Sequence, residues 1–206
     1  MPKTIFDNKE LRDKRFDTIV NTSLKLFAIY GYKKVTIDMI TKECHYSHGL
    51  FYHYFSSKAN VLEEIKKRSN KLFNMKLKEI AEKTSTGRDF LRETLCVILD
   101  FINKGSIENY YVHLLLEDKL EDLNSGKVTA HLTKEIHNKL IDAIKELKAE
   151  LPNYKLSVLK TYYVFFISSL DGLSKVKINY PKLLKKDIDG YLFFDQIIAF
   201  LRAKTQ

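Results

Sequence analysis

Cysteine is scarce in this sequence of 206 residues, and long apolar runs are missing. Only Cys44 and Cys96 are present, with no spacing typical of metal ligands, which indicates a reducing compartment. The longest mostly apolar run, near residues 162–170, is far too short to span a bilayer, and the polar, charged start does not resemble a signal peptide. We therefore expect a cytoplasmic protein that does not enter a membrane.

Sequence motifs that mark enzyme active sites are also missing. There is no glycine-rich phosphate loop, no His-Glu-x-x-His and no Gly-x-Ser-x-Gly, and the histidines and acidic residues form no recognisable constellation. An active site would have to be assembled without any local signal. We expect a protein that is not an enzyme and that carries no cofactor.

Helical periodicity runs through the whole sequence, without a strand pattern or a repeat. Apolar residues recur at helical spacing from Phe16 to Ala28 and predict an amphipathic helix of about five turns that ends at Gly31. Thr36 is a good N-cap for a second helix of about two turns. After a break at residues 45–47, Ser47 can cap a third helix. This arrangement is a helix-turn-helix.

The third helix has two different faces. Phe51 and Phe55 fall on one face, where they can pack against a scaffold. The other face offers hydrogen-bonding rings, a bare backbone and no acid, and it consists of His48, Gly49, Tyr52 and His53. Such a face suits phosphates and base edges better than catalysis.

These elements resemble the tetracycline-repressor (TetR) family of bacterial transcription regulators. The family pattern is a long helix ending Leu-Phe-x-x-x-Gly-Tyr, a Thr-x-x-x-Ile helix, a Ser in the turn, and then Gly-x-x-Tyr-x-x-Phe-x-x-Lys-x-x-x-Leu. The matching residues are Leu26, Phe27, Gly31, Tyr32, Thr36, Ile40, Ser47, Gly49, Tyr52, Phe55, Lys58 and Leu62. The resemblance covers residues 12–65 and departs from the pattern at Cys44, His45 and Tyr46; histidine tolerates a positive φ better than most residues.

The resemblance implies an all-α fold of about nine helices, which agrees with the helix start and stop signals along the chain. Residues 1–57 would form a three-helix helix-turn-helix domain that binds DNA, and residues 58–206 a larger helical domain for effector binding and dimerisation. The expected partners are a second copy, a palindromic operator in double-stranded DNA and a small-molecule effector that releases the repressor. The alternative is a DNA-bound adaptor of the same fold whose larger domain binds a protein instead.

The expected DNA contacts cluster in the most basic part of the chain. Residues 1–83 have a net charge of +7 and residues 84–206 of +2. Tyr52 and Lys58 are expected at phosphates, and the start of the third helix at base edges. The complete predicted set is Thr36, Ser47, His48, Gly49, Leu50, Tyr52, His53, Tyr54 and Lys58.

The last two helices, which the sequence predicts from about residue 156 to 177 and from about residue 184 to 204, are apolar on too many sides to face one interior. A two-fold interface of four helices would cover them, and the alternative is the centre of a monomeric bundle. The interface candidates are Val158, Phe165, Gly172, Tyr191, Phe194, Ile198 and Leu201. The effector pocket candidates, each of which could equally be ordinary core, are Phe101, Tyr110, Tyr111, His113, Tyr162, Tyr163 and Phe166.

Three further groups have simpler interpretations. No cysteine or carboxylate completes a metal-ligand set beside the histidines at 45, 48 and 53, so we expect no metal. Cys44 lies on an apolar stripe and is interpreted as a small buried hydrophobe rather than a redox sensor. An acidic group is interpreted as a solvated face that could also receive a cation, and it consists of Glu117, Asp118, Glu121 and Asp122.

Overall fold

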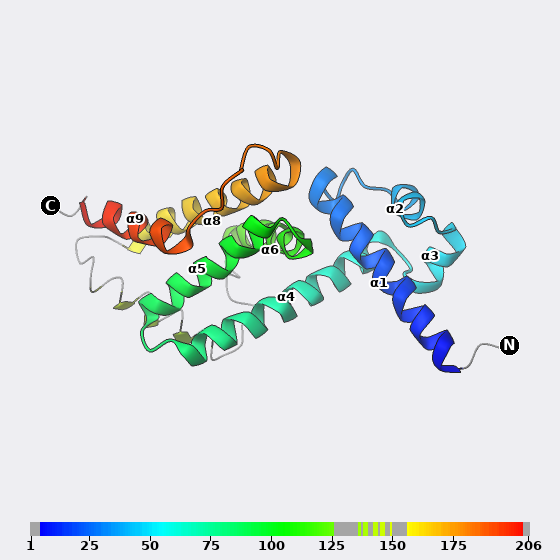
Figure 1. The fold of residues 1–206 in the computed structure, drawn as a ribbon, viewed down its shortest axis with the longest axis horizontal. Helices are drawn as coiled ribbons and strands as arrows, with labels where there is room; N and C mark the ends of the chain where they lie inside the picture. Colours follow the sequence, from blue (N-terminus) through cyan, green and yellow to red (C-terminus); the bar gives the residue numbers. More distant parts are fainter. Residues whose placement is uncertain are drawn as a thin grey trace. The chain divides into compact units, whose positions relative to one another are not determined.

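The structure, a computed structural model, describes residues 5–125, single residues between 136 and 149, and residues 156–203 (Figure 1). These residues form eight helices, and no strand occurs among them. The all-α prediction is confirmed. Most of the helix that the sequence predicts at residues 129–150 lies outside the described residues. The chain divides into two compact units, Met1–Arg68 and Ser69–Gln206.

The first unit contains α1 (Ile5–Tyr30), α2 (Ile37–Cys44), α3 (His48–Tyr54) and the start of α4 (Lys58–Lys83). Gly31 ends α1 with φ +82°, a conformation that only glycine adopts without strain. Between α2 and α3, His45 has φ 56° and a left-handed conformation. The helix-turn-helix that the sequence predicts is therefore present, with the histidine turn intact.

The caps of α2 and α3 are those that the sequence predicts. The hydroxyl of Thr36 accepts a hydrogen bond from the backbone N–H of Met39 at 3.2 Å, and the hydroxyl of Ser47 accepts one from Leu50 at 3.2 Å. A cap of this kind contributes about 1 kcal/mol to stability. Two short helices that would not form alone thus begin at fixed residues.

Aromatic and branched side chains of α1, α2, α3 and α4 fill the core of the first unit. The ring of Phe16 stacks on that of Phe55 with centroids 4.9 Å apart. The fully buried members are Ile19, Val20, Leu24, Phe27, Ile40, Phe51, Val61 and Ile65. Truncating a buried phenylalanine such as Phe51 would cost about 3–5 kcal/mol. This packing holds the inner face of α3, so its outer face is presented on a firm support.

The first unit continues past residue 57 because the start of α4 packs with it. Arg68 of α4 donates a hydrogen bond to Asp17 of α1 at 2.7 Å, and its guanidinium lies over the ring of Phe16. The boundary between the two compact units therefore lies after Arg68. The division into domains 1–57 and 58–206 stays a prediction.

The second unit contains the rest of α4 with α5 (Gly87–Lys104), α6 (Ile107–Ser125), α8 (Leu156–Asn179) and α9 (Gly190–Ala203). Its main hydrophobic core joins all five of these helices. The buried residues of this core are Phe73, Leu95, Leu99, Phe101, Ile102, Val112, Leu116, Leu170, Phe194 and Ile198. In this unit α6 and α8 make the most extensive contact, followed by α5 and α9.

The last helix begins later than the sequence predicts, at Gly190 rather than Leu184. Asp189 decides this start, since its carboxylate accepts hydrogen bonds from the backbone N–H groups of Tyr191 and Leu192 at 2.9 and 3.1 Å. At Gly190, a Cβ would lie 2.8 Å from the sulfur of Cys96. A side chain there would push α9 away from α5.

Candidate nucleic-acid interface

The outer face of α3 is the candidate nucleic-acid interface. His48, Gly49, Tyr52 and His53 are exposed, and 54% of the surface of Tyr52 is accessible. Leu50 and Tyr54 are partly buried, the latter with its ring edge against Phe16. The exposed residues offer hydrogen-bonding groups without a carboxylate, which suits the grooves and phosphates of DNA.

One acidic side chain does reach α3, from α2. His48 Nε2 lies 2.5 Å from Oδ1 of Asp38, and both side chains are more than half exposed. Asp38 is in the first turn of α2, where the helix dipole stabilises a negative charge. The sequence does not predict this contact, because ten positions separate the two residues and they lie on different helices.

Lys58 is held by the protein itself rather than presented freely. Its ammonium donates hydrogen bonds to the backbone carbonyls of Tyr32 and Val35 at 2.7 and 2.6 Å, and it lies 4.3 Å from the centroid of the Tyr32 ring. Two of its three donors thus fix the loop between α1 and α2. The structure gives Lys58 a role in that loop, which the expectation of a phosphate contact did not include.

The cap hydroxyls and Gly49 also have defined local roles. The hydroxyls of Thr36 and Ser47 each accept a hydrogen bond from a backbone N–H, which leaves the O–H donor of each for an acceptor such as a phosphate. A Cβ at Gly49 would meet only the hydroxyl of Ser47, at 3.9 Å. Within the protein alone an alanine would therefore fit at 49, and any need for glycine there must come from a bound partner.

Two basic residues that the sequence analysis missed lie next to α3. A hollow of about 440 Å³ is lined by Lys9, Arg12, Asp13, Phe16, His53 and Tyr54. Its walls come from α1 and α3, and Lys9 and Arg12 are exposed. A concave, basic surface beside a candidate reading helix fits a phosphate. Only the packing of α1 on α3 brings these residues together.

The effector candidates of the second unit pack mostly in its interior. Phe101 and Tyr111 are buried, Phe101 with its ring edge on Phe73, and Tyr110 is partly buried. The side chains of Tyr162, Tyr163 and Phe166 lie outside the described residues. No common pocket of these residues emerges from the part of the chain that the structure describes.

His113 belongs to a buried polar group between α6 and α8. Its Nδ1 lies 2.7 Å from Asp171, whose other oxygen accepts a hydrogen bond from Lys175 at 2.7 Å. Burial raises the pKa of the Asp171 carboxyl, but the hydrogen bonds and charges of His113 and Lys175 outweigh it, so the pKa lies below its ordinary value. The hydroxyl of Ser174 donates to Asn109 nearby at 2.7 Å. The carboxylate thus ties α6 to α8.

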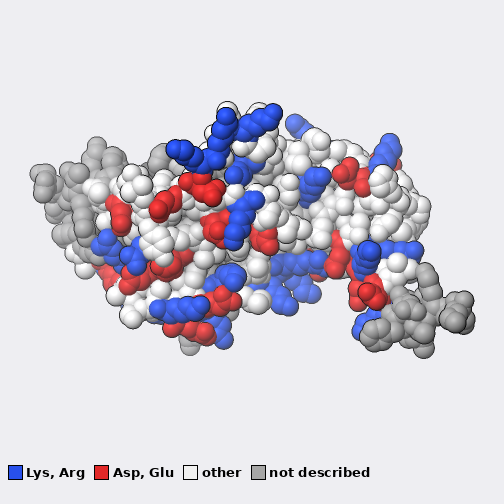
Figure 2. Space-filling model, in the orientation of Figure 1, with Lys and Arg blue, Asp and Glu red and all other residues white. Residues whose placement is uncertain are grey.

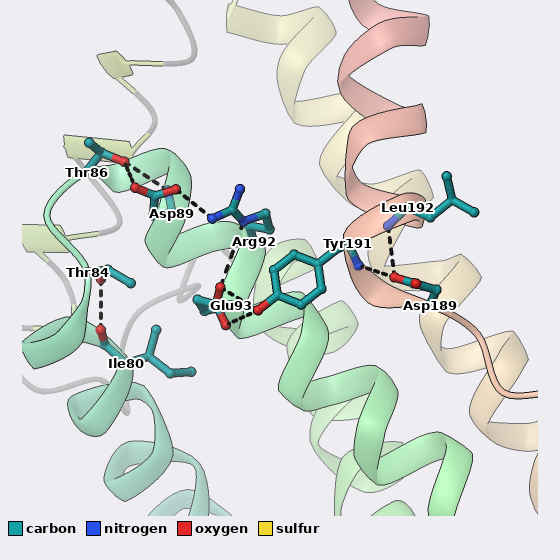
Figure 3. Close-up of polar contacts among 9 residues, drawn as sticks. All are labelled: Ile80, Thr84, Thr86, Asp89, Arg92, Glu93, Asp189, Tyr191 and Leu192. Atoms are coloured by element: carbon teal, nitrogen blue, oxygen red, sulfur yellow. Dashed lines mark hydrogen bonds and ion pairs between the residues drawn. The ribbon is translucent and has the colours of Figure 1, made fainter.

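A second hollow, of about 470 Å³, opens between α4 and α5. Figure 3 shows residues that line it, among them Asp89, Arg92 and Glu93. Arg92 pairs with Asp89 at 3.0 Å and lies over the ring of Tyr191, a residue beside the hollow whose hydroxyl donates to both oxygens of Glu93. The hydrogen bond to Glu93, with a smaller effect of burial, raises the pKa of Tyr191. Charges of both signs line this hollow, and none of the predicted effector residues lies in it.

The structure separates the interface candidates into exposed and buried residues. Phe194 and Ile198 pack in the core of their own chain, with 6% and 5% of their surface accessible, so they offer little surface to a second copy. Gly172 and Tyr191 are exposed, and Leu192, which was not among the candidates, is 58% exposed. The side chains at 158, 165 and 201 lie outside the described residues.

The remaining candidates have plain surroundings. Cys44 is buried, and burial, with the charge of Glu43 adding to it and a hydrogen bond with Thr22 opposing it, raises the pKa of its thiol, which makes it a poor nucleophile. Among the described residues, no three His, Cys, Asp or Glu side chains are grouped as metal ligands. In the same residues, none of the helices combines the length and apolarity that a membrane span requires. Glu117 is exposed, and the side chains of Asp118, Glu121 and Asp122 are outside the described residues.

Comparison with known proteins finds similarity in both units. The family of bacterial regulatory proteins, tetR family, matches residues 19–65. A Bacillus subtilis (strain 168) protein named uncharacterized HTH-type transcriptional regulator YuxN is 35% identical over 92 residues, 41% of this chain and 32% of that protein. The match thus spans about a third of that relative. The fatty acid degradation regulator FadR from Bacillus halodurans has a similar fold, with a TM-score of 0.57 and 18% identity over 91% of this chain and 94% of that one.

Proposed function

We propose that the chain, whose residues 19–65 match the tetR family of bacterial regulatory proteins, binds a palindromic operator as a dimer and represses transcription in the cytoplasm. The observation that carries the proposal is the supported outer face of α3. Its inner residues are buried, while its rings and bare backbone are exposed. A short helix so held enters the major groove in helix-turn-helix proteins.

Pairing is proposed because α3 is too short to bind one DNA site firmly alone. Single modules of this kind bury a small surface and act on half-sites that a two-fold axis relates. The exposed residues of α9, including Tyr191 and Leu192, support the proposal that α8 and α9 of two copies pack together. Large apolar side chains at these positions would otherwise face water.

We also propose that a small molecule releases the protein from its operator. A ligand acts on DNA binding only if it prefers one of two arrangements of the dimer. The hollow between α4 and α5, with its lining of charges of both signs, supports a polar effector. A helix that begins in the DNA-binding unit and continues in the other, as α4 does, offers a connection between effector and operator.

A second candidate, the DNA-bound adaptor, is favoured by the turn between α8 and α9. Tyr180 and Leu183 are 63% and 73% exposed there. Lys and Arg gather over the end of α8 and this turn in Figure 2, and the exposed lysines are Lys175, Lys182, Lys185 and Lys186. An acidic protein with an apolar residue would match this surface. A screen of small molecules by thermal shift separates the two candidates, because only the first requires a stabilising compound.

The DNA-binding proposal predicts a loss on removal of one hydroxyl. Tyr52→Phe should weaken binding to all DNA sequences alike by roughly 5-fold, about 1 kcal/mol for one hydrogen bond to a phosphate. Fluorescence anisotropy over a salt series measures it. The control is Tyr180→Phe, which removes a hydroxyl from a tyrosine of the other unit that is at least as exposed, and it should leave DNA affinity unchanged. Equal affinities of wild type and Tyr52→Phe at every salt concentration would contradict the proposed phosphate contact.

A further inference from the structure

We propose that Asp38 is a specificity-determining residue of the DNA interface, because it positions the imidazole of His48. The inference rests on the proposed function of α3. His48 is the first residue of α3, and Asp38 lies on the neighbouring helix α2 (Figure 1). The 2.5 Å between Nε2 and Oδ1 joins them directly. A side chain placed to read a base is thus held from a second helix.

The contact decides which nitrogen of His48 is left for DNA. A carboxylate oxygen only accepts hydrogen bonds, so Nε2 carries a proton and donates a hydrogen bond to Asp38. Nδ1 is then the ring nitrogen left for DNA. Asp38 therefore fixes which edge of the His48 ring can contact a base at one position of each half-site.

The contact between Asp38 and His48 positions the histidine rather than stabilising the fold. The side chains are 54% and 61% exposed, and ion pairs that exposed contribute little to folding. A carboxylate beside a DNA-binding face also repels phosphates and so weakens binding to every sequence. A charge that lowers affinity for DNA, and whose pair with His48 adds little stability, is explained if it fixes the orientation of a reading side chain.

The second carboxylate of α2 provides a matched control. Glu43 is also exposed, and it lies 3.6 Å from Lys25 of α1, away from His48. Glu43→Ala removes the same charge from the same helix as Asp38→Ala. Asp38→Asn removes the charge but keeps an oxygen that can accept from Nε2. Together the three variants separate charge from positioning.

The experiment is selection from random DNA, followed by affinities for the selected sequence and its single-base changes. All three variants should bind DNA more tightly than wild type. Only Asp38→Ala should lose discrimination at one position of each half-site, by about fivefold, the lower end of what a good base contact contributes. Asp38→Asn and Glu43→Ala should keep it. In a His48→Ala background, Asp38→Ala should change no preference further.

The possible failures are distinguishable. If wild type selects a motif and Asp38→Ala selects the same motif with the same discrimination, the positioning role is overturned while the proposed function stands. The role is also overturned if Asp38→Ala changes preference in the His48→Ala background. If wild type selects no motif at all, the proposed function itself fails, and the role of Asp38 fails with it.

Discussion

At the scale of single residues, charged side chains of this protein often bind the protein's own groups. Lys58 donates to two carbonyls of the loop after α1, and Asp171 accepts from His113 and Lys175 inside the second unit. Buried or partly buried contacts to a charged group are worth more than exposed ones. The number of charged residues in the sequence therefore overestimates how many charged side chains are free to contact DNA.

Lys58→Met should destabilise the first unit. Two hydrogen bonds from an ammonium to carbonyls are lost, and we expect the free energy of unfolding to fall by about 2 kcal/mol. Denaturant unfolding measures it, with Lys33→Met, an exposed lysine of the same loop, as a control that should stay within about 0.5 kcal/mol of wild type. An unchanged unfolding free energy together with weaker DNA binding would assign Lys58 to a phosphate instead.

Asp171→Asn should make the free energy of unfolding less dependent on pH in the acidic range. The folded-state pKa of Asp171 is lowered, so the carboxylate contributes stability above the unfolded-state value of about 3.9, and that contribution is lost as the pH falls through the folded pKa. At neutral pH the variant should be less stable by about 3 kcal/mol. Denaturant unfolding from pH 7 to 3 should show the gap to wild type narrowing below about pH 4. Asp195→Asn, on the exposed face of α9, should match wild type throughout; a constant gap for Asp171→Asn would refute the linkage.

At the scale of helices, what the sequence predicts well is local. The caps Thr36 and Ser47 and the end of α1 at Gly31 follow from signals within four residues, and the structure has all three. The start of α9 was missed because it depends on Asp189 and on the approach of Gly190 to Cys96, nearly a hundred positions away in the sequence. Contacts between helices, such as His113 with Asp171, leave no periodic pattern to find.

At the scale of the whole molecule, the surface of α9 decides how assembly can be tested. Phe194 and Ile198 belong to the core of one chain, and a charge there would unfold it whether or not the protein pairs. Leu192 is exposed instead. The candidate interface can therefore be altered without altering the core.

Leu192→Glu should separate the dimer and leave the fold intact. The new charges would repel across a two-fold interface, so sedimentation at micromolar concentration should give a monomer, and affinity for the operator should fall at least tenfold, about 1.4 kcal/mol. Circular dichroism should be unchanged. Leu183→Glu, the same substitution at an even more exposed leucine of the preceding turn, should remain dimeric. A wild type that sediments as a monomer and still binds a palindrome tightly would exclude pairing as the basis of affinity.

Because α9 lies close to α5 at Gly190, the thiol of Cys96 can be used to follow motion between these two helices. Cys96 is partly buried and lies against Gly190, so a change in the rate at which it is alkylated reports a change in the packing of α9 on α5. Cys44, buried between α1 and α2, reports the opening of the other unit in the same way. The sequence contains no other thiols, so each unit has one cysteine whose alkylation rate reports on that unit. The effect of an operator or an effector on each unit can then be followed by which of the two alkylation rates it slows.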